Sequence, residues 1–464
     1  MTRSLTTRFA SLMLLGLASP AAAAPIAHRE VLPNGIVLLV AERPAVPIVA
    51  VRALVQAGAV HDPPDRAGLA NLTGVLLTRG TTKRTGPELD SAIEFVGGSL
   101  EAGAGRDSIG ASLRVLKPDL GLGLDLLSEV ILSPTFPPDE VTRKIGEIQA
   151  SIKRSEEDPG AVAARALARL VFPGHPYGLP VEGTRESVAR LTRDDVVKFH
   201  RERFRPDATV VAVVGAVTVD EARREVLGRF GSWARPASPL PGVPTASAGR
   251  EPREEVIPRD LTQATIMFGR QAIRQTDPDY FALVVASYVL GGGSASRLYT
   301  RVREEGGLAY SVYSYVSPSK YGSAFFVSAQ TRIAEVPKVR TLLNAELARM
   351  TREPPSDAEL SLAKAYLVGS FPLRLDTSAK VADFVSAIEE LGLGLDYADR
   401  YKERVARVTA REVQRAAQRF FIPETFNRVV VGRTPSDAPE SSCPRSSVRC
   451  SCCGRSRRSR PHSR

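Results

Sequence analysis

The chain contains an internal duplication, and this repeat constrains the fold more than any other feature of the sequence. Six residues recur at a constant shift of 217 positions: Thr192, Val196, Phe204, Pro206, Val214 and Gly215 recur as Thr409, Val413, Phe421, Pro423, Val431 and Gly432. A second pair, Gly97-Gly98 and Gly306-Gly307, is shifted by 209 positions, so the two copies differ by a short gap. The alternative is that two unrelated domains share common turn residues. The repeat predicts two related domains of similar size.

Strand and helix signals alternate within both copies. Apolar runs rich in Val or Ile predict strands at 36–40, 48–55, 210–214 and 429–431, the first of them entered through the turn Leu32-Pro33-Asn34-Gly35. Capping boxes, in which a Ser or Thr is followed three residues later by an acid, predict helix starts at Thr192/Asp195, Ser356/Glu359 and Thr409/Glu412. This pattern predicts an α+β fold with helices packed on one face of each sheet. The residues alone leave the strand direction open.

The two ends of the chain differ from its body. Arg3 and Arg8, the apolar run 9–17 and the small residues 19–24 predict a signal peptide over residues 1–23, and therefore a periplasmic or secreted protein. Residues 441–464 contain eight Ser, seven Arg and four Cys, which predicts a disordered tail over 435–464 or the product of a frameshift. Between the ends we expect an N-terminal domain at 24–234, a linker at 235–254 and a C-terminal domain at 255–434.

The net charge of +11 is concentrated in those ends. Without the seven Arg of the tail and the two Arg of the signal segment, residues 25–440 carry only +2, too little for the basic face that nucleic-acid binding requires. All four Cys belong to the tail, and their spacing is not that of a zinc knuckle: Cys443, Cys450, Cys452 and Cys453. No run after residue 24 is long and apolar enough for a membrane helix. We therefore expect neither a nucleic-acid partner nor a membrane span.

Three segments together resemble a known peptidase family. Residues 68–81 (GLANLTGVLLTRGT), 172–178 (FPGHPYG) and 291–311 (GGGSASRLYTRVREEGGLAYS) are similar to segments of the pitrilysin/insulinase-type zinc metallopeptidases. The resemblance covers about residues 28–432. It implies two related domains, each a mainly antiparallel sheet with helices packed on one face. Together these domains would form half of a clamshell that a second chain closes around a peptide.

The helix expected at 68–81 departs from the family pattern at its reactive positions. In the family this helix carries His-x-x-Glu-His: two His bind zinc, the Glu between them activates water, and a distant Glu completes the site. The aligned residues are Asn71, Gly74 and Val75, and the distant position falls at about Ser151, with Glu147 one turn earlier. An amide, a hydrogen atom and an isopropyl group provide none of this chemistry. We expect no metal and no cofactor on this chain, and no catalysis by this chain alone.

Two further segments match the family's peptide-handling residues. Arg303 and Tyr310, seven residues apart, match the pair with which active members bind the peptide and its developing oxyanion. Residue type alone would favour a surface Arg paired with a carboxylate and a half-buried Tyr. Gly98, Ser99 and Leu100 resemble the entry to the edge strand on which the family lays extended peptides, and the alternative is a plain sheet turn.

Several functions remain open on these observations. The first is a non-catalytic subunit of an exported heterodimeric zinc metalloendopeptidase, in which Arg303 and Tyr310 assist a homologous partner chain that bears His-x-x-Glu-His and zinc. The second is a scaffold or peptide-binding, chaperone-like protein with no role in proteolysis. The third is an independent hydrolase that uses other residues, for which the sequence has no local signature. Among the remaining His residues, His200 lies beside Arg201 on an expected helix and is predicted to be a surface residue.

Overall fold

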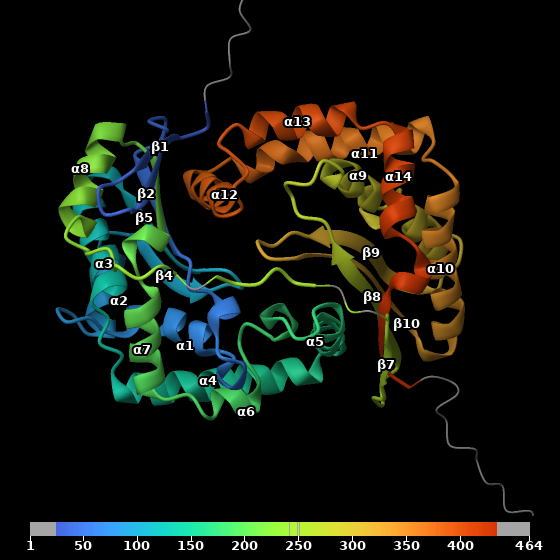
Figure 1. The fold of residues 1–464 in the computed structure, drawn as a ribbon, viewed down its shortest axis with the longest axis horizontal. Helices are drawn as coiled ribbons and strands as arrows, with labels where there is room; N and C mark the ends of the chain where they lie inside the picture. Colours follow the sequence, from blue (N-terminus) through green and yellow to red (C-terminus); the bar gives the residue numbers. More distant parts are fainter. Residues whose placement is uncertain (1–24, 241, 248, 250, 434–464) are drawn as a thin grey trace, which may run out of the picture.

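Two β-sheets, one in each half of the chain, organise the molecule (Figure 1). The computed structural model describes residues 25–240, 242–247, 249 and 251–433. The predicted signal peptide (1–23) and the predicted tail (435–464) lie outside these residues. None of the helices in the described residues has both the length and the hydropathy of a membrane span.

The first sheet has six strands in the order β1-β2-β6-β3-β5-β4. Their bounds are β1 (His28–Val31), β2 (Val37–Glu42), β3 (Ile48–Val55), β4 (Ser99–Ala104), β5 (Ile109–Leu116) and β6 (Thr209–Gly215). Only β2 and β6 run parallel; the other neighbouring strands are antiparallel. The helices of this half are α1 (Leu69–Leu76), α2 (Gly86–Phe95), α3 (Leu120–Leu132), α4 (Pro138–Glu157), α5 (Pro159–Val171), α6 (Arg185–Val188), α7 (Arg193–Arg203) and α8 (Val219–Phe230).

The second sheet has five strands in the order β7-β11-β8-β10-β9. Their bounds are β7 (Glu254–Ile257), β8 (Gln263–Ala272), β9 (Ala309–Ser317), β10 (Ser323–Arg332) and β11 (Asn427–Val431). Only β7 and β11 are parallel. The helices are α9 (Tyr280–Gly291), the π-helical turn η7 (Tyr299–Glu304), α10 (Val336–Arg352), α11 (Asp357–Ser370), α12 (Ser378–Glu390), α13 (Tyr397–Arg407) and α14 (Ala410–Phe420). Both sheets are mainly antiparallel, so the predicted α+β class is confirmed.

The duplication is visible element by element. Thr192 caps α7 and Thr409 caps α14, each through a complete capping box, so these predicted helix starts are confirmed. The strands that close the two copies, β6 and β11, end beside Gly215 and Gly432, whose φ angles are 146° and 136°. An added Cβ at Gly215 would lie 2.1 Å from the Ile48 oxygen, so both the conformation and the space require glycine there.

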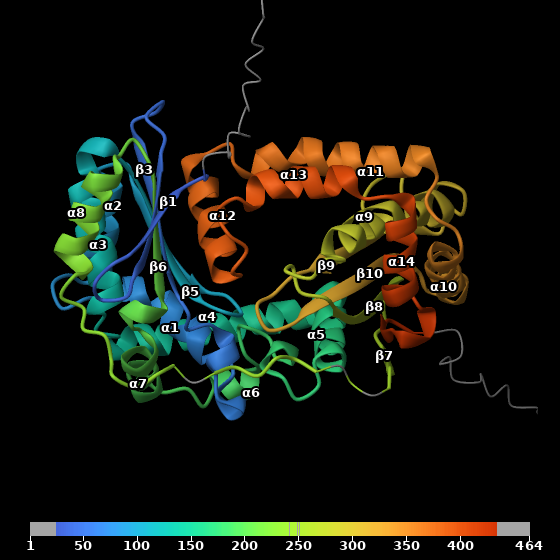
Figure 2. The same ribbon diagram turned by 45° about the horizontal axis from the view of Figure 1, so that its top comes forward.

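Each half sends one helix onto the sheet of the other half. Helix α5 packs on the face of the second sheet that carries Met267 and Phe326, and helix α12 packs on the face of the first sheet that carries Leu39 and Val214. Figures 1 and 2 show the main helix layers on the outside, with α5 and α12 between the sheets. The two helices are themselves counterparts, because their starts differ by 219 positions. The exchange buries the inner sheet faces reciprocally, a feature that the sequence did not predict.

A polar contact joins the hairpin turns of the two halves. Tyr177 donates a hydrogen bond to Asp107, in the β4–β5 turn, and its hydroxyl accepts one from the Tyr321 N–H at 3.1 Å. The Lys320 N–H donates to Asp107 Oδ2 at 3.3 Å. His175 orients this tyrosine, because its Nδ1 accepts from the Tyr177 N–H at 3.1 Å. The loop 172–178 therefore holds the two halves together.

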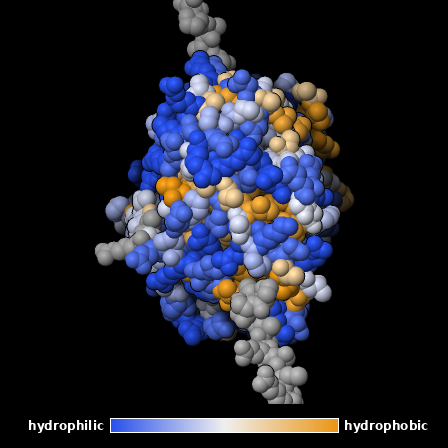
Figure 3. All heavy atoms as spheres, turned by 90° about the vertical axis from the view of Figure 1, so that its right-hand side faces the viewer, coloured by the Kyte–Doolittle hydropathy of each residue, from blue (hydrophilic) through white to orange (hydrophobic). Residues whose placement is uncertain are grey.

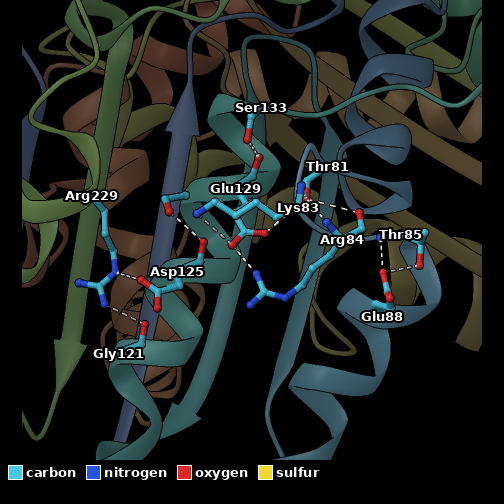
Figure 4. Close-up of polar contacts among 11 residues, drawn as sticks. Thr81, Lys83, Arg84, Thr85, Glu88, Gly121, Asp125, Glu129, Ser133 and Arg229 are labelled. Atoms are coloured by element: carbon cyan, nitrogen blue, oxygen red, sulfur yellow. Dashed lines mark hydrogen bonds and ion pairs between the residues drawn. The ribbon is translucent and has the colours of Figure 1, made fainter.

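Each copy also contains a buried glutamate on a helix that packs against its sheet: Glu129 on α3 and Glu346 on α10. Glu129 on α3 pairs with Arg84 and Lys83 and accepts a hydrogen bond from Thr81 (Figure 4). Glu346 on α10 follows Glu129 by 217 positions, one repeat, and its Oε1 lies 3.6 Å from Arg301 Nε. Burial raises the pKa of Glu346, while the surrounding arginines lower it. These ion pairs tie loops to the helices behind each sheet.

One face of the molecule, shown in Figure 3, is mostly polar. Figure 3 shows the side on which α10 and α14 lie in Figure 1: hydrophilic residues dominate, and apolar residues form scattered patches. Scattered apolar side chains are normal on a protein surface.

Candidate functional site

Helix α1 occupies the place where the family resemblance implies a zinc helix. It runs from Leu69 to Leu76 and tightens into a 3₁₀ turn at Leu77–Arg79, so the α-helix is shorter than the predicted segment 68–81. Gly80, with φ of 154°, follows this turn. Apolar residues of α1 enter the core of the first half, which explains why this short segment is helical.

The reactive positions of α1 carry no metal-binding group. Asn71 and Val75 are half-buried, and Val75 packs against the core. Gly74 is buried against the edge strand: an added Cβ would lie 2.9 Å from both the Ala104 nitrogen and the Gly103 carbonyl carbon of β4. A glutamate side chain therefore has no space there unless β4 moves. The donor set on α1 does not fit zinc.

The distant ligand position is equally unsuited. Ser151 on α4 is exposed, and Glu147 one turn earlier is engaged by Arg143 and by Lys144, the latter at 2.8 Å. These bases lower the pKa of Glu147, chiefly through the hydrogen bond from Lys144. Among the described residues, no three His, Cys, Asp or Glu side chains are placed to hold a metal ion together.

A buried carboxylate caps the same helix. Asp62 accepts hydrogen bonds from the Gly68 N–H and the Ala70 N–H, both at 2.8 Å. Burial raises the pKa of Asp62 to about 7, although these hydrogen bonds oppose the shift. Gly68, the residue before the first turn of α1, has a φ angle of 97°, in the left-handed region that favours glycine. Asp62 thus fixes the start of α1, a role that its sequence position gave no reason to predict.

The structure brings Arg303 and Tyr310 together. Arg303 lies on η7 and donates from Nη1 to the Tyr310 carbonyl oxygen at 2.7 Å. Its guanidinium carbon lies 4.9 Å from the centre of the Tyr299 ring and 5.0 Å from that of the Tyr310 ring. The guanidinium therefore contacts two tyrosine rings and one carbonyl group, and no carboxylate lies within ion-pair distance among the described residues. Tyr299, four residues before Arg303, was missed, although helical spacing would have indicated it.

Tyr310 is presented to solvent by an irregularity in the edge strand. In the pairing of β9 with β10, Gln330 faces Ser311 and Thr331 faces Ala309, so Tyr310 is the extra residue of a β-bulge. A bulge redirects one side chain without breaking the strand. Tyr310 is 75% exposed as a result. An Arg and a phenol thus stand at the free edge of the second sheet, both able to donate hydrogen bonds.

The predicted peptide-binding segment lies at the free edge of the first sheet. Gly98 precedes β4, and Ser99 and Leu100 begin it. Among the described residues β4 pairs with β5 alone, so the main-chain groups of its outer edge have no strand partner. Ser99 and Leu100 are half-buried. Within the described residues no hydrogen bond or ion pair joins this segment to Arg303 or Tyr310, which lie on the counterpart edge of the other sheet.

Comparison with known proteins identifies the family. The family model described as "Insulinase (Peptidase family M16)" matches residues 37–185, and the model described as "Peptidase M16 inactive domain" matches residues 190–367. An uncharacterized zinc protease of Streptomyces coelicolor is 30% identical, with 88% of both chains covered. The non-peptidase homolog YmxG of Helicobacter pylori is 25% identical over 88% of this chain and 94% of its own.

A solved structure supports the same assignment. The peptidase M16 inactive domain from Pseudomonas fluorescens superimposes with a TM-score of 0.83 at 25% identity, covering 88% of this chain and 98% of that one. A protease from Helicobacter pylori, 20% identical, shares the fold with the same TM-score and covers 88% of this chain and all of its own. On sequence, fold and domain order together, the chain belongs to the insulinase family, peptidase family M16.

Proposed function

We propose that this chain is the non-catalytic subunit of an exported heterodimeric zinc metalloendopeptidase. Its partner would be a homologous chain that bears His-x-x-Glu-His and holds the zinc ion. This chain would contribute peptide binding and contacts to the transition state. The substrate would be a peptide or an unfolded polypeptide enclosed between the two chains.

The observation that carries this proposal is the contrast between the two halves. Helix α1 offers an amide, no side chain and an isopropyl group, and β4 occupies the space of a catalytic base. Arg303 and Tyr310, in contrast, are in contact, and Tyr310 is exposed while Arg303 is half-buried. Packing does not explain an exposed phenol on a bulge beside an Arg that has no acidic partner among the described residues. A role in trans accounts for both facts.

Arg303 and Tyr310 have the chemistry of the residues that bind the peptide and its oxyanion in a peptidase site, apart from the metal and its water. The Tyr310 hydroxyl donates a hydrogen bond, and it can stabilise the oxyanion that develops on a peptide carbonyl. The Arg303 guanidinium has several donors in a fixed fork, so it can hold the peptide while still contacting the Tyr310 carbonyl. The partner chain would supply the electrophile and activated water.

The names of two relatives describe opposite activities, one a protease and the other not a peptidase. The Streptomyces coelicolor relative is called a zinc protease, and the Helicobacter pylori relative is called a non-peptidase homolog. For this chain the absence of suitable donors at Asn71, Gly74 and Val75 favours the second description. The pair Arg303 and Tyr310 adds the reason for an association with an active chain.

The test is cleavage of peptides by a mixed complex. This chain is co-purified with a His-x-x-Glu-His-bearing homologue from the same host, and cleavage of an unfolded polypeptide is measured for the complex and for each chain alone. Tyr310→Phe should lower kcat by about 10²–10³, as removal of an oxyanion donor does. Tyr313→Phe, on the same strand and also exposed, is the matched control and should leave kcat unchanged.

Two results would overturn the proposal. One is equal cleavage by the Tyr310→Phe complex and the unchanged complex. The other is stoichiometric zinc, measured by metal analysis, in this chain purified alone, together with chelator-sensitive peptide cleavage. Equal assembly of both variants, checked by gel filtration, shows that a loss of cleavage is chemical rather than structural.

A peptide-holding role without proteolysis is the second candidate. The free edge of β4 favours it, because an extended peptide can add to such an edge through main-chain hydrogen bonds alone. This role predicts that the chain alone slows aggregation of an unfolded protein and that Tyr310→Phe has no effect on any associated cleavage. Absence of a zinc-bearing homologue in the host genome would favour it.

Export is proposed from residues 1–23 and has its own test. The mature protein, purified from its native host, should begin after Ala22 or Ala23 and be released with the periplasmic or extracellular fraction. An N-terminal sequence that begins at Met1 or Thr2 would contradict export.

A further inference from the structure

A cavity of about 320 Å³ in the C-terminal half has no role in the function proposed above. It lies between α9, α11, α13 and the end of β9. Figure 1 labels these elements in its right-hand half. Five tyrosines and one arginine dominate its lining: Tyr280, Tyr288, Tyr315, Tyr397, Tyr401 and Arg374. The volume is at the small end of the range for ligand pockets, which corresponds to one residue-sized group.

The duplication explains where this cavity lies. An added Cβ at Gly291 would lie 2.6 Å from the Ser314 nitrogen of β9, just as one at Gly74 would collide with β4. Gly291 follows Gly74 by one repeat of 217 positions. The position that corresponds to Asn71 in the second copy, 217 residues later, is Tyr288, which lines the cavity. The second half thus has an aromatic cavity beside its edge strand, at the counterpart of the α1 surface that carries no reactive group.

The cavity wall favours an aromatic guest. Tyr288 is held by stacking on Tyr366, with ring centres 4.7 Å apart, and Tyr397 and Tyr401 lie with ring centres 6.1 Å apart. Burial raises the pKa of Tyr280, so its phenol remains neutral. Aromatic rings gain about 0.5–1.5 kcal/mol per pair from edge-to-face or offset contacts, beyond the area they bury. An aliphatic guest of equal size would lack this gain.

Two polar groups at the cavity, Arg374 and the Tyr397 hydroxyl, favour an acceptor on the guest. Arg374 is exposed, with its guanidinium carbon 5.9 Å from the centre of the Tyr401 ring, and within the described residues no carboxylate lies at ion-pair distance from it. The Tyr397 hydroxyl accepts from Gln275 Nε2 at 2.6 Å and so keeps its own proton to donate. An unpaired guanidinium repels cationic side chains and attracts carboxylates.

We propose that this cavity binds an aromatic side chain of a peptide whose next group is a carboxylate, either an acidic residue or the chain end. The peptide character of the ligand rests on the proposed function; the aromatic and acidic character rests on the cavity itself. The site would hold part of the substrate away from the Arg303–Tyr310 pair and would bias the complex towards such sequences.

Binding is tested on the purified full chain without any partner. Four short peptides are compared by isothermal titration: one with Tyr followed by a free C-terminal carboxylate, its C-terminal amide, one with Tyr-Glu before a terminal amide, and the first with Tyr replaced by Ala. The Ala peptide should bind at least about 10-fold more weakly. The amide without Glu should bind about 5-fold more weakly, and the Tyr-Glu peptide shows whether the chain end or a side chain is preferred.

Two variants locate the site. Arg374→Gln, at an exposed position, should abolish the preference for the carboxylate and leave the affinity for the amide unchanged. Val284→Trp, which fills the cavity from α9, should abolish binding of all Tyr peptides, with circular dichroism as the check on folding. Arg404→Gln, a basic position on α13 outside the lining, is the matched control and should change nothing.

Equal affinity for the Ala and Tyr peptides would overturn the proposal, and so would an unchanged carboxylate preference in Arg374→Gln. Neither result depends on proteolysis, because no partner is present. Failure of the mixed complex to cleave peptides would overturn the proposed function but leave binding in this cavity measurable. The two ideas therefore fail separately.

Discussion

Arg303 contacts the rings of Tyr299 and Tyr310, and the sequence analysis predicted only the second of these residues. We predict that Tyr299→Leu lowers kcat of the mixed complex about 2- to 5-fold, because a partly exposed cation–π contact contributes about 0.5–1 kcal/mol. Tyr299→Phe keeps the ring and should restore kcat. Peptide cleavage assays measure both, with Phe95→Leu, at an exposed position in the other half, as the control.

Loss of kcat in Tyr299→Leu and its recovery in Tyr299→Phe would show that the ring positions Arg303, because a general destabilisation of the fold would not be reversed by the ring alone. If Tyr299→Leu and Tyr299→Phe reduced kcat equally, the ring would not be the group that orients Arg303. If KM rose while kcat stayed constant, Arg303 would act in substrate binding alone.

His200 illustrates a residue whose sequence surroundings were misleading. It was predicted to lie on the surface, but its ring centre lies 4.2 Å from that of Phe204 and 5.5 Å from that of Phe136. Its Nε2 hydrogen-bonds the Ile131 carbonyl at 2.8 Å. Burial lowers the pKa of His200 to about 4. The prediction failed because Val196 and Phe199 turn one side of α7 towards the core, and His200 lies on that side.

The pKa shift of His200 predicts a pH dependence of stability. The folded-state pKa lies below the unfolded value of about 6.5, so the neutral ring stabilises the fold fully above pH 6.5. This contribution is lost as pH falls from about 6.5 to 4, by up to about 3 kcal/mol. Chemical denaturation should show that His200→Gln loses less stability than the unchanged chain over this window. His61, whose pKa is lowered in the same direction, contributes equally to both proteins and cancels.

At the scale of the element, the contact between α1 and β4 decides what α1 can do. We predict that Gly74→Ala destabilises the protein by about 1–3 kcal/mol, because its Cβ would meet the β4 backbone at 2.9 Å. The better helix propensity of Ala should not compensate, since it contributes about 1 kcal/mol. Thermal or urea unfolding measures the change.

Gly228 on α8 provides the matched control. It is also a helical glycine, but an added Cβ there meets no atom within 4 Å. Gly228→Ala should therefore stabilise slightly, by about 0.5–1 kcal/mol. If Gly74→Ala were equally harmless, the argument that β4 excludes a catalytic base from α1 would be wrong, and reintroduction of His-x-x-Glu-His would become feasible.

At the scale of the whole molecule, the reciprocal helices make the two halves one cooperative unit. Leu167 on α5 is fully buried against the second sheet, although α5 belongs to the first half of the sequence. Leu167→Ala should cost about 2–5 kcal/mol and shift a single unfolding transition that involves both sheets. Calorimetry combined with hydrogen exchange of β3 and β8 tests this.

The control for Leu167→Ala is Leu362→Ala, at a position on α11 that is 47% exposed. This change should cost less than about 0.5 kcal/mol. Two separate transitions, of which only one moves in Leu167→Ala, would show that the halves fold independently. The scaffold for the proposed site would then be two linked domains rather than one body.

Much of this arrangement followed from the sequence because it depends on local chemistry. The capping boxes at Thr192 and Thr409 and the apolar strand at Ile48–Val55 are short-range signals, and the structure contains each of them. The repeat gave the two related domains, because equivalent residues at a constant shift must serve equivalent positions. The lack of metal donors at Asn71, Gly74 and Val75 is likewise a property of the residues themselves.

Only the tertiary structure could decide the features that join distant segments. The exchange of α5 and α12, the stacking of Arg303 on Tyr299, and the tyrosine cavity beside β9 all bring together side chains whose own sequence patterns are ordinary. The bulge that exposes Tyr310 depends on a one-residue mismatch between β9 and β10, which no single strand records. Sequence specifies which groups are available locally, whereas long-range packing determines which of them meet, because burial and pairing are properties of two segments at once.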